Sequence, residues 1–210
     1  MATLAILPVK SFSHAKQRLR HEVPPQLRQA LAEAMLLDVL GALARCRTLA
    51  GVLVISPSDH AREVAVGCGA RALADTGEGH NAAALLGLCL ATQEGMARAL
   101  LVPGDCPALD PAEVDELVVR PHPSQGVLIV PDRHGTGTNA LLLTPPGALE
   151  PSFGPGSCAR HQDHARRQGV DSEVVQVSSL ALDVDTPEDL DSLAALAERA
   201  PRTFELLSRC

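Results

Sequence analysis

The loop Pro8–Leu19 holds the only two lysines of the 210-residue chain, Lys10 and Lys16, and Arg18 follows closely. A triphosphate needs several positive donors on different oxygens, with lysine acting as a point charge and arginine as a planar fork. The loop therefore indicates a triphosphate-binding site, although an ordinary solvated basic loop has the same composition. It contains neither a GxxxxGK[ST] motif nor a GxGxxG motif.

Carboxylates follow two other apolar runs. Asp105 lies in LVPGDCPAL, while Asp183 and Asp185 lie in LDVDTPEDL. Magnesium commonly takes one or two protein carboxylates together with substrate phosphates, so Asp105 and one of the pair would form a metal site. Asp183 and Asp185 are expected to alternate on a strand end and to point to opposite faces. The alternatives are an Asx-turn at Asp105 and a helix-capping turn at 186–188.

Three further loops carry small polar residues. In DTGEGHN, residues 75–81, two glycines would let the backbone approach a flat ligand at a helix start, and Asn81 would read a base edge or cap that helix. In DRHGTGTN, residues 132–139, neutral donors suit a small anion, although a plain hairpin turn fits equally. In FGPGSCARH, residues 153–161, Ser157, Arg160 and His161 would bind phosphate and carboxylate, or Ser157 would cap a helix beside exposed Arg160 and His161.

Apolar runs of strand length alternate with longer helical patterns, and these elements must position the loops. Strands are expected at 3–7, 51–56, 70–74, 99–103, 126–131, 140–144 and 174–177, and helices at 24–45, 60–67, 81–94, 111–119, 157–168 and 187–198. Continuous apolar strands are buried on both faces, as in a parallel sheet. We expect one α/β domain over residues 1–210, with a mostly parallel sheet flanked by helices and ligands at the carboxyl ends of its strands.

The composition excludes several classes of function. A formal net charge of −7 and only three aromatic residues argue against a nucleic-acid partner, and no apolar stretch is long enough to span a membrane. The six cysteines show no CxxC spacing and are expected to be reduced thiols. We expect a cytoplasmic protein. Its oligomeric state does not follow from the sequence.

Taken together, PVKSFSHAKQRL, DTGEGHN, PGDCPAL, GTGTNALL, FGPGSCARH and LDVDTPEDL resemble the 2-phospho-L-lactate guanylyltransferase family of coenzyme F420 biosynthesis, which includes the phosphoenolpyruvate guanylyltransferases. The resemblance covers nearly the whole chain. It implies a Rossmann-like nucleotidyltransferase fold of the glycosyltransferase-A-like kind. It also implies that GTP and a three-carbon phospho-acid react to a guanylylated diphosphate and pyrophosphate. The acceptor would be 2-phospho-L-lactate, phosphoenolpyruvate or 3-phosphoglycerate.

The resemblance also assigns residues, motif by motif. Those implied for GTP are Pro8, Lys10, Lys16, Arg18, Gly79 and Asn81, with Lys10, Lys16, Arg18 and Asp105 taking part in catalysis. Those implied for the acceptor are Thr138, Gly154 and Ser157. Mg²⁺ would be held by Asp105 with Asp183 or Asp185. His80 and Cys158 depart from the family pattern. Two alternatives are an enzyme of the same fold that acts on a sugar phosphate or molybdopterin, and a non-catalytic nucleotide-binding module.

Overall fold

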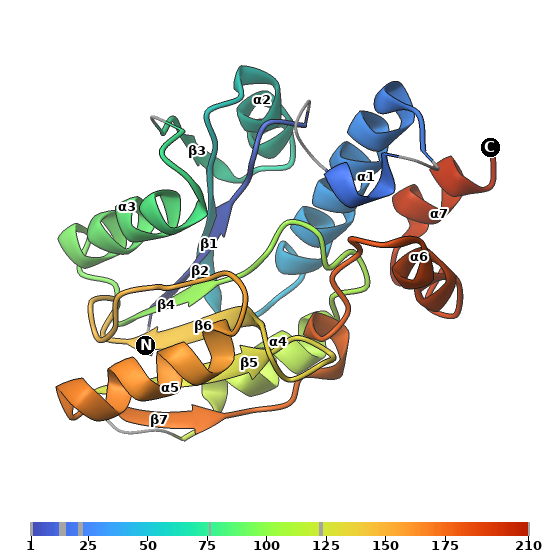
Figure 1. The fold of residues 1–210 in the computed structure, drawn as a ribbon. Coiled ribbons are helices and arrows are strands. Elements are labelled where there is room, and N and C mark those ends of the chain that lie inside the picture. Colours follow the sequence, from blue (N-terminus) through green and yellow to red (C-terminus); the bar gives the residue numbers. More distant parts are fainter. Residues whose placement is uncertain (1, 13–15, 21–22, 76, 122–123, 210) are drawn as a thin grey trace.

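The computed structural model describes residues 2–12, 16–20, 23–75, 77–121 and 124–209, which form one seven-stranded sheet with helices on both faces (Figure 1). The strands are β1 (Thr3–Pro8), β2 (Leu49–Ile55), β3 (Arg71–Leu73), β4 (Arg98–Leu101), β5 (Gly126–Pro131), β6 (Thr138–Thr144) and β7 (Asp171–Val174). The α-helices are α1 (Pro25–Leu43), α2 (Asp59–Gly67), α3 (His80–Gln93), α4 (Pro111–Val119), α5 (Ser157–Gln168), α6 (Pro187–Ala194) and α7 (Pro201–Leu207). Two short 3₁₀ helices are η2 (Gln17–Leu19) and η3 (Ser178–Leu180).

The sheet has the strand order β3-β2-β1-β4-β6-β5-β7, and every pairing is parallel except those of β6. The expected α/β class with a mostly parallel sheet is therefore confirmed. The antiparallel direction of β6 was not expected, because its apolar run is as continuous as that of a parallel strand. All seven of its residues are buried, so both faces of β6 lie in the core.

Each face of the sheet has its own apolar layer. On one face, α1, α2 and α4 pack on alternate strand residues such as Leu7, Val54 and Leu142. On the other face, α3 and α5 cover the intervening residues such as Ile6 and Leu141. The period of two along each strand thus sorts its side chains between two helical layers.

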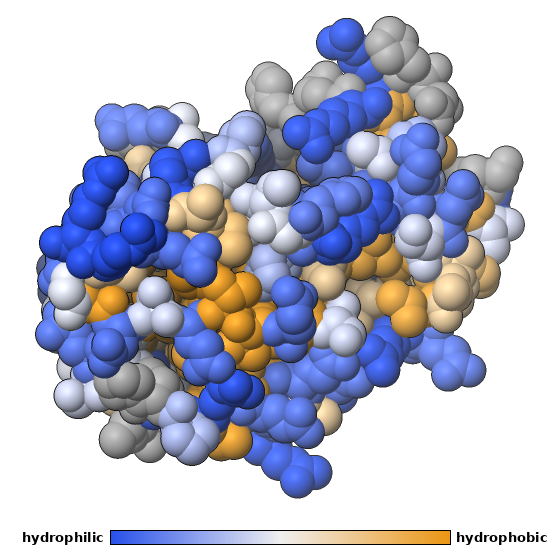
Figure 2. Space-filling model, turned by 60° about the horizontal axis from the view of Figure 1, so that its bottom comes forward, coloured by the Kyte–Doolittle hydropathy of each residue, from blue (hydrophilic) through white to orange (hydrophobic). Residues whose placement is uncertain are grey.

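The C-terminal helices form a third layer. Leu31 and Met35, on the outer side of α1, pack with Leu193 and Ala200 from the C-terminal part of the chain. The carboxylate of Asp38 accepts hydrogen bonds from the backbone N–H groups at 202 and 203, at 3.1 and 2.9 Å. The end of the chain therefore covers α1 and does not cover the sheet. In the view of Figure 2, hydrophilic residues cover most of the surface, and apolar residues gather in a patch near the centre and in smaller areas to its right.

The structure differs from the expectation at the last strand, at segment 181–186 and at two helix caps. The last strand begins at Asp171 and not at 174; all four of its residues are exposed, so hydropathy could not locate it. Segment 181–186 lies outside the sheet, so Asp183 and Asp185 are not on a strand. The cap of α3 is Gly79 and not Asn81, and that of α5 is Gly156, so Ser157 is a first helical residue.

A close approach between α3 and the sheet depends on Gly87. A Cβ atom at this position would clash with Cγ2 of Ile6 and lie 2.8 Å from Cδ1 of Ile55, and both neighbours are fully buried. We expect Gly87→Ala to lower the free energy of unfolding by about 1–3 kcal/mol, the cost of overpacking a core. The matched control is Gly41→Ala in α1, where the nearest atom is 3.9 Å away and the better helix propensity of alanine should stabilise the protein. Urea unfolding measures both; equal effects would contradict the packing argument.

Candidate active site at the carboxyl edge of the sheet

The loops that carry the candidate functional residues meet at one edge of the sheet. This edge holds the carboxyl ends of β1, β4 and β5, which are followed by the loops with Lys10, Asp105 and Asp132. Because β6 is antiparallel, its first residue, Thr138, lies at the same edge. Residues 13–15 of the basic loop and Thr76 of the DTGEGHN loop lie outside the described residues.

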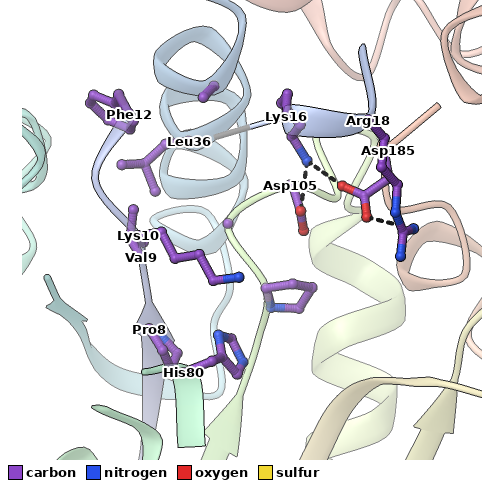
Figure 3. A pocket seen from close by; sticks show the side chains of 13 residues that line it. Pro8, Val9, Lys10, Phe12, Lys16, Arg18, Leu36, His80, Asp105 and Asp185 are labelled. Atoms are coloured by element: carbon purple, nitrogen blue, oxygen red, sulfur yellow. Dashed lines mark hydrogen bonds and ion pairs between the residues drawn. The ribbon is translucent and has the colours of Figure 1, made fainter. Parts of the chain in front are cut away.

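The centre of the site is a lysine between two carboxylates (Figure 3). Nζ of Lys16 lies 2.7 Å from Oδ2 of Asp105 and 3.1 Å from Oδ1 of Asp185. On the far side of Asp185, the guanidinium of Arg18 lies 3.2 Å from its Oδ2. The Lys16 side chain is 5% exposed, while each carboxylate side chain is about one third exposed. Acidic residues 80 positions apart, from 105 to 185, therefore share one positive charge at the edge of a cleft.

The charges of this group support one another. Burial alone would lower the pKa of Lys16, but the carboxylates of Asp105 and Asp185 outweigh it and raise the pKa above its ordinary value. Burial likewise would raise the pKa of Asp105, but the Lys16 ammonium holds it below its ordinary value. At neutral pH the site thus contains charged groups of both signs.

A cleft of about 360 Å³ opens beside this group, lined at one end by Lys16, Asp105 and Asp185 and at the other by Pro8, Lys10 and His80. A second cleft of about 240 Å³ shares Pro8, Lys10 and His80 with it, and adds Asp75, Gly77 and Gly79. The structure thus brings the basic loop, the glycine loop and the carboxylates to one continuous surface. It has the groups that a triphosphate with an attached nucleoside requires.

Asp183 lies beside the other two carboxylates in a different setting. Its Oδ1 accepts a hydrogen bond of 3.2 Å from the amide of Asn139, which also donates to the carbonyl of Leu180 at 2.7 Å. Burial, followed by the charge of Asp105, raises the pKa of Asp183. Its carboxylate is therefore held by a neutral donor, whereas that of Asp185 is held by cations.

The segment that carries these acids is fixed by Asp189 in the first turn of α6. One Asp189 oxygen accepts hydrogen bonds from the N–H groups of Asp185 and Thr186, at 2.8 and 2.7 Å. The other lies 2.5 Å from the guanidinium of Arg133, and the backbone N–H of Arg133 donates to the carbonyl of Ala181. The helix-capping turn expected here is present, and it also positions Asp185.

Asn81 joins the glycine loop to the FGPGSCARH loop. Its Oδ1 accepts from the N–H of Phe153 at 2.8 Å, and its Nδ2 donates to the carbonyl of Phe153 at 3.3 Å. The ring of Phe153 stacks edge-on against His80, with centroids 4.9 Å apart. The side chain of Asn81 therefore binds the backbone of Phe153 and links the two loops.

The residues expected to bind the acceptor, Thr138, Gly154 and Ser157, are not among the described residues that line the two clefts. The N–H of Ser157 donates to the carbonyl of Gly154 at 3.0 Å. Thr138, on the strand, reaches the same helix through the ring of His161, since its Oγ1 lies 3.0 Å from Nδ1. Hydrogen bonds therefore join Ser157 to Gly154 and Thr138 to His161. They connect β6, the loop 152–156 and α5.

The side chains of Arg160 and His161 form hydrogen bonds within the protein. From the sequence we expected them to bind the acceptor or to be exposed. The guanidinium of Arg160 donates to the side chain and carbonyl of Ser152 at 3.0 and 2.9 Å and to the carbonyl of Pro155 at 2.6 Å. His161 is fully buried. Both residues thus hold the loop 152–156. The only local signal was their position in the first turns of the helix that follows the glycines of this loop.

Burial and the nearby charges of Arg160 and His164 lower the pKa of His161 to about 4. Because an unfolded histidine titrates near 6.5, the unfolded state binds more protons between pH 6.5 and 4, and stability must fall as the pH falls through this window. We expect the wild type to lose about 2 kcal/mol more than His161→Asn between pH 7 and pH 5. Urea unfolding at both pH values checks this; parallel losses in the two proteins would show that His161 titrates normally.

The remaining expectations concern the cysteines, membrane-spanning helices and metal-binding clusters. The five described cysteines are free thiols, as expected. Within the described residues, no helix is long and apolar enough to cross a membrane. The same part of the chain contains no cluster of three or more His, Cys, Asp or Glu side chains arranged for a metal. A metal here would rest on two carboxylates and on oxygens of a ligand, as Mg²⁺ often does beside phosphates.

The chain is similar to known guanylyltransferases over most of its length. The chain is 48% identical over 198 residues to a phosphoenolpyruvate guanylyltransferase from Conexibacter woesei, covering 93% of this chain and 89% of the relative. It is 39% identical to a 3-phospho-D-glycerate guanylyltransferase from Phenylobacterium zucineum (97% and 94% covered) and 37% identical to a 2-phospho-L-lactate guanylyltransferase from Methanothermobacter thermautotrophicus (92% and 84% covered).

A solved nucleotidyl transferase from Methanothermobacter superposes with a TM-score of 0.66 at 18% identity, over 94% of this chain and 98% of that one, which shows the shared fold. The family model described as "Guanylyl transferase CofC like" matches residues 3–203. The family resemblance seen in the sequence motifs is thereby confirmed. With this fold and these relatives, the chain belongs to the CofC-like guanylyl transferase family and is a nucleotidyltransferase.

Proposed function

We propose that this enzyme transfers GMP from GTP to the phosphate of a three-carbon phospho-acid and releases pyrophosphate, in the biosynthesis of coenzyme F420. The observation that carries the proposal is the single cation shared by Asp105 and Asp185 beside a basic cleft, in a chain of a guanylyltransferase family. The acceptor would be phosphoenolpyruvate, 2-phospho-L-lactate or 3-phosphoglycerate, the acids named in its relatives. Phosphoenolpyruvate is the first to test, since relatives at 48% and 42% identity carry that name.

The basic loop would bind the triphosphate. Lys10, Lys16 and Arg18 offer positive charge along the cleft, and Pro8 forms part of its wall. Gly79 would let the nucleoside approach the start of α3, where the first N–H groups of a helix have no partner within the helix. Asn81 would line this pocket through its backbone. Thr138, Gly154 and Ser157 would bind the phosphate and carboxylate of the acceptor.

The residues present fit a magnesium ion. The Lys16 ammonium already stands between Asp105 and Asp185, which shows that their oxygens converge on one positive charge. We propose that Asp105 and Asp185 hold Mg²⁺. Asp183, whose carboxylate is hydrogen-bonded to Asn139, has only a supporting role at this site. When bound, Mg²⁺ would neutralise charge on the phosphate oxygens.

The reaction needs no protein base. A phosphate oxygen of the acceptor attacks the α-phosphorus of GTP, a new P–O bond forms, and the bond to the β-phosphate breaks so that pyrophosphate leaves. The acceptor phosphate is already largely ionised at pH 7, so no proton has to be removed. The chain contributes by holding the triphosphate with Lys10, Lys16 and Arg18 and by orienting the acceptor against it.

The test is incubation of the purified protein with GTP, Mg²⁺ and each acid, followed by mass analysis of the products. We expect one guanylylated diphosphate and one pyrophosphate per turnover with at least one three-carbon acid. Sugar phosphates and molybdopterin belong in the same panel, and CTP in place of GTP is the control for the base. Product from a sugar phosphate alone, or no product from any acid, would overturn the proposal.

We further propose that residues 1–210 act as one nucleotidyltransferase domain in the cytoplasm. GTP and phosphorylated three-carbon acids are cytoplasmic metabolites, which supports this location. No nucleic-acid or membrane partner is part of the proposal.

A further inference from the structure

The imidazole of His161 has two defined partners. Its Nε2 lies 2.9 Å from the backbone nitrogen of Ser152, and its Nδ1 lies 3.0 Å from Oγ1 of Thr138. The ring is fully buried and packs edge-on against Phe153, with centroids 5.4 Å apart. Its orientation is therefore fixed by two hydrogen bonds and one ring contact.

The partner at Ser152 determines which nitrogen carries the proton. A backbone N–H can only donate, so Nε2 must accept and must be unprotonated. A neutral imidazole then carries its hydrogen on Nδ1, and this N–H donates to Thr138. The low pKa of His161 agrees with the neutral form.

The tautomer in turn sets the role of the Thr138 hydroxyl. Because its oxygen accepts from Nδ1–H, its own hydrogen remains for another acceptor. Phosphate and carboxylate groups offer acceptors only, so they require a hydroxyl that donates. With the opposite tautomer, Thr138 would donate to the ring and present lone pairs to the anion.

We propose that His161 is a positioning residue for the acceptor acid: it orients the Thr138 hydroxyl as a donor and fixes Ser152 at the start of the loop that leads to Gly154 and Ser157. This rests on the proposed function, because it takes the acceptor to bind at Thr138. His161 itself does not touch the reacting atoms. It acts through Thr138 and through the backbone of the loop.

Two substitutions separate the two hydrogen bonds. His161→Asn keeps an N–H near the position of Nδ1 and loses the acceptor for Ser152, whereas His161→Gln can accept from Ser152 but has no donor for Thr138. We expect His161→Gln to raise the KM for the acceptor roughly tenfold, the scale of one lost buried hydrogen bond, and to leave the KM for GTP within about twofold. His161→Asn should have the smaller effect on the acceptor KM.

Thr138 supplies the decisive comparison. Thr138→Val should raise the acceptor KM about as much as His161→Gln, and Thr138→Ser should restore most of the loss. If His161 acts through this hydroxyl, the double variant Thr138→Val/His161→Gln should be no more than about twofold worse than Thr138→Val alone. Fully additive effects, or a GTP KM that rises as much as the acceptor KM, would overturn the proposal.

A second measurement does not depend on turnover. Two-dimensional ¹H–¹⁵N NMR of the imidazole at pH 7 should show His161 protonated on Nδ1 and unprotonated on Nε2. Protonation of Nε2 would overturn the inference even if the guanylyl transfer is confirmed. The expected tautomer, together with no product from any acid, would show instead that the proposed function has failed and with it the acceptor role of Thr138.

Discussion

Replacing Asp105 with asparagine is expected to lower kcat by about 10²-fold or more at saturating GTP and Mg²⁺. Asparagine keeps the shape of the side chain and the backbone carbonyl that accepts from Val184 at 3.0 Å, but it removes the negative charge. Loss of one strong electrostatic contributor to a transition state costs on this scale. Pyrophosphate release under steady-state conditions gives the number.

The matched control is Asp191→Asn, which makes the same change of charge at an exposed position in α6. Its kcat should stay within about twofold of the wild type, since an exposed charge that does not line the cleft contributes little. Turnover of Asp105→Asn near the wild-type rate would remove Asp105 from the catalytic centre. Equal losses in both variants would point to a general effect of net charge.

Lys16→Met is expected to have two separable effects. The KM for GTP should rise roughly tenfold, because a buried charge-assisted donor to the triphosphate is lost. In addition, Mg²⁺ without nucleotide should raise the Tm of the variant more than that of the wild type. The reason is that the ammonium, 2.7 and 3.1 Å from the two carboxylates, occupies the position that a divalent cation would take.

Lys10→Met is the control for this pair of effects. Lys10 lines the same cleft but is exposed, and Asp105 and Asp185 are paired with Lys16. Its substitution should raise the KM for GTP and leave the Tm response to Mg²⁺ unchanged. An unchanged GTP KM in Lys16→Met, or equal Mg²⁺ responses in all three proteins, would contradict the role given to Lys16.

The sequence predicted that the basic loop and the carboxylates would meet, because the carboxyl ends of parallel strands lie at one edge of the sheet. Lys16, Asp105 and Asp185 each follow a different apolar run, and the structure brings all three within hydrogen-bonding distance. The sequence could not show that Asp183 and Asp185 have different partners. Asp183 accepts a hydrogen bond from Asn139, whereas Asp185 pairs with Arg18, and both partners come from distant parts of the chain.

The acceptor side was harder to predict for a topological reason. Since β6 runs antiparallel, its carboxyl end lies at the opposite edge from the site, and residues 145–156 return the chain to it. The side chains that fix this return are Asn81, Arg160 and His161, which bind backbone groups. As sequence they resemble a helix cap and exposed polar residues, and only their partners show their role.

The central claim is that Asp105 and Asp185 together bind the divalent cation that accompanies GTP. Electron paramagnetic resonance of Mn²⁺, titrated into protein with a non-hydrolysable GTP analogue, tests it most directly. The account predicts that Asp105→Asn and Asp185→Asn each weaken Mn²⁺ binding at least tenfold, while Asp183→Asn changes it by less than about threefold. Wild-type Mn²⁺ affinity in both Asp105→Asn and Asp185→Asn would contradict the account.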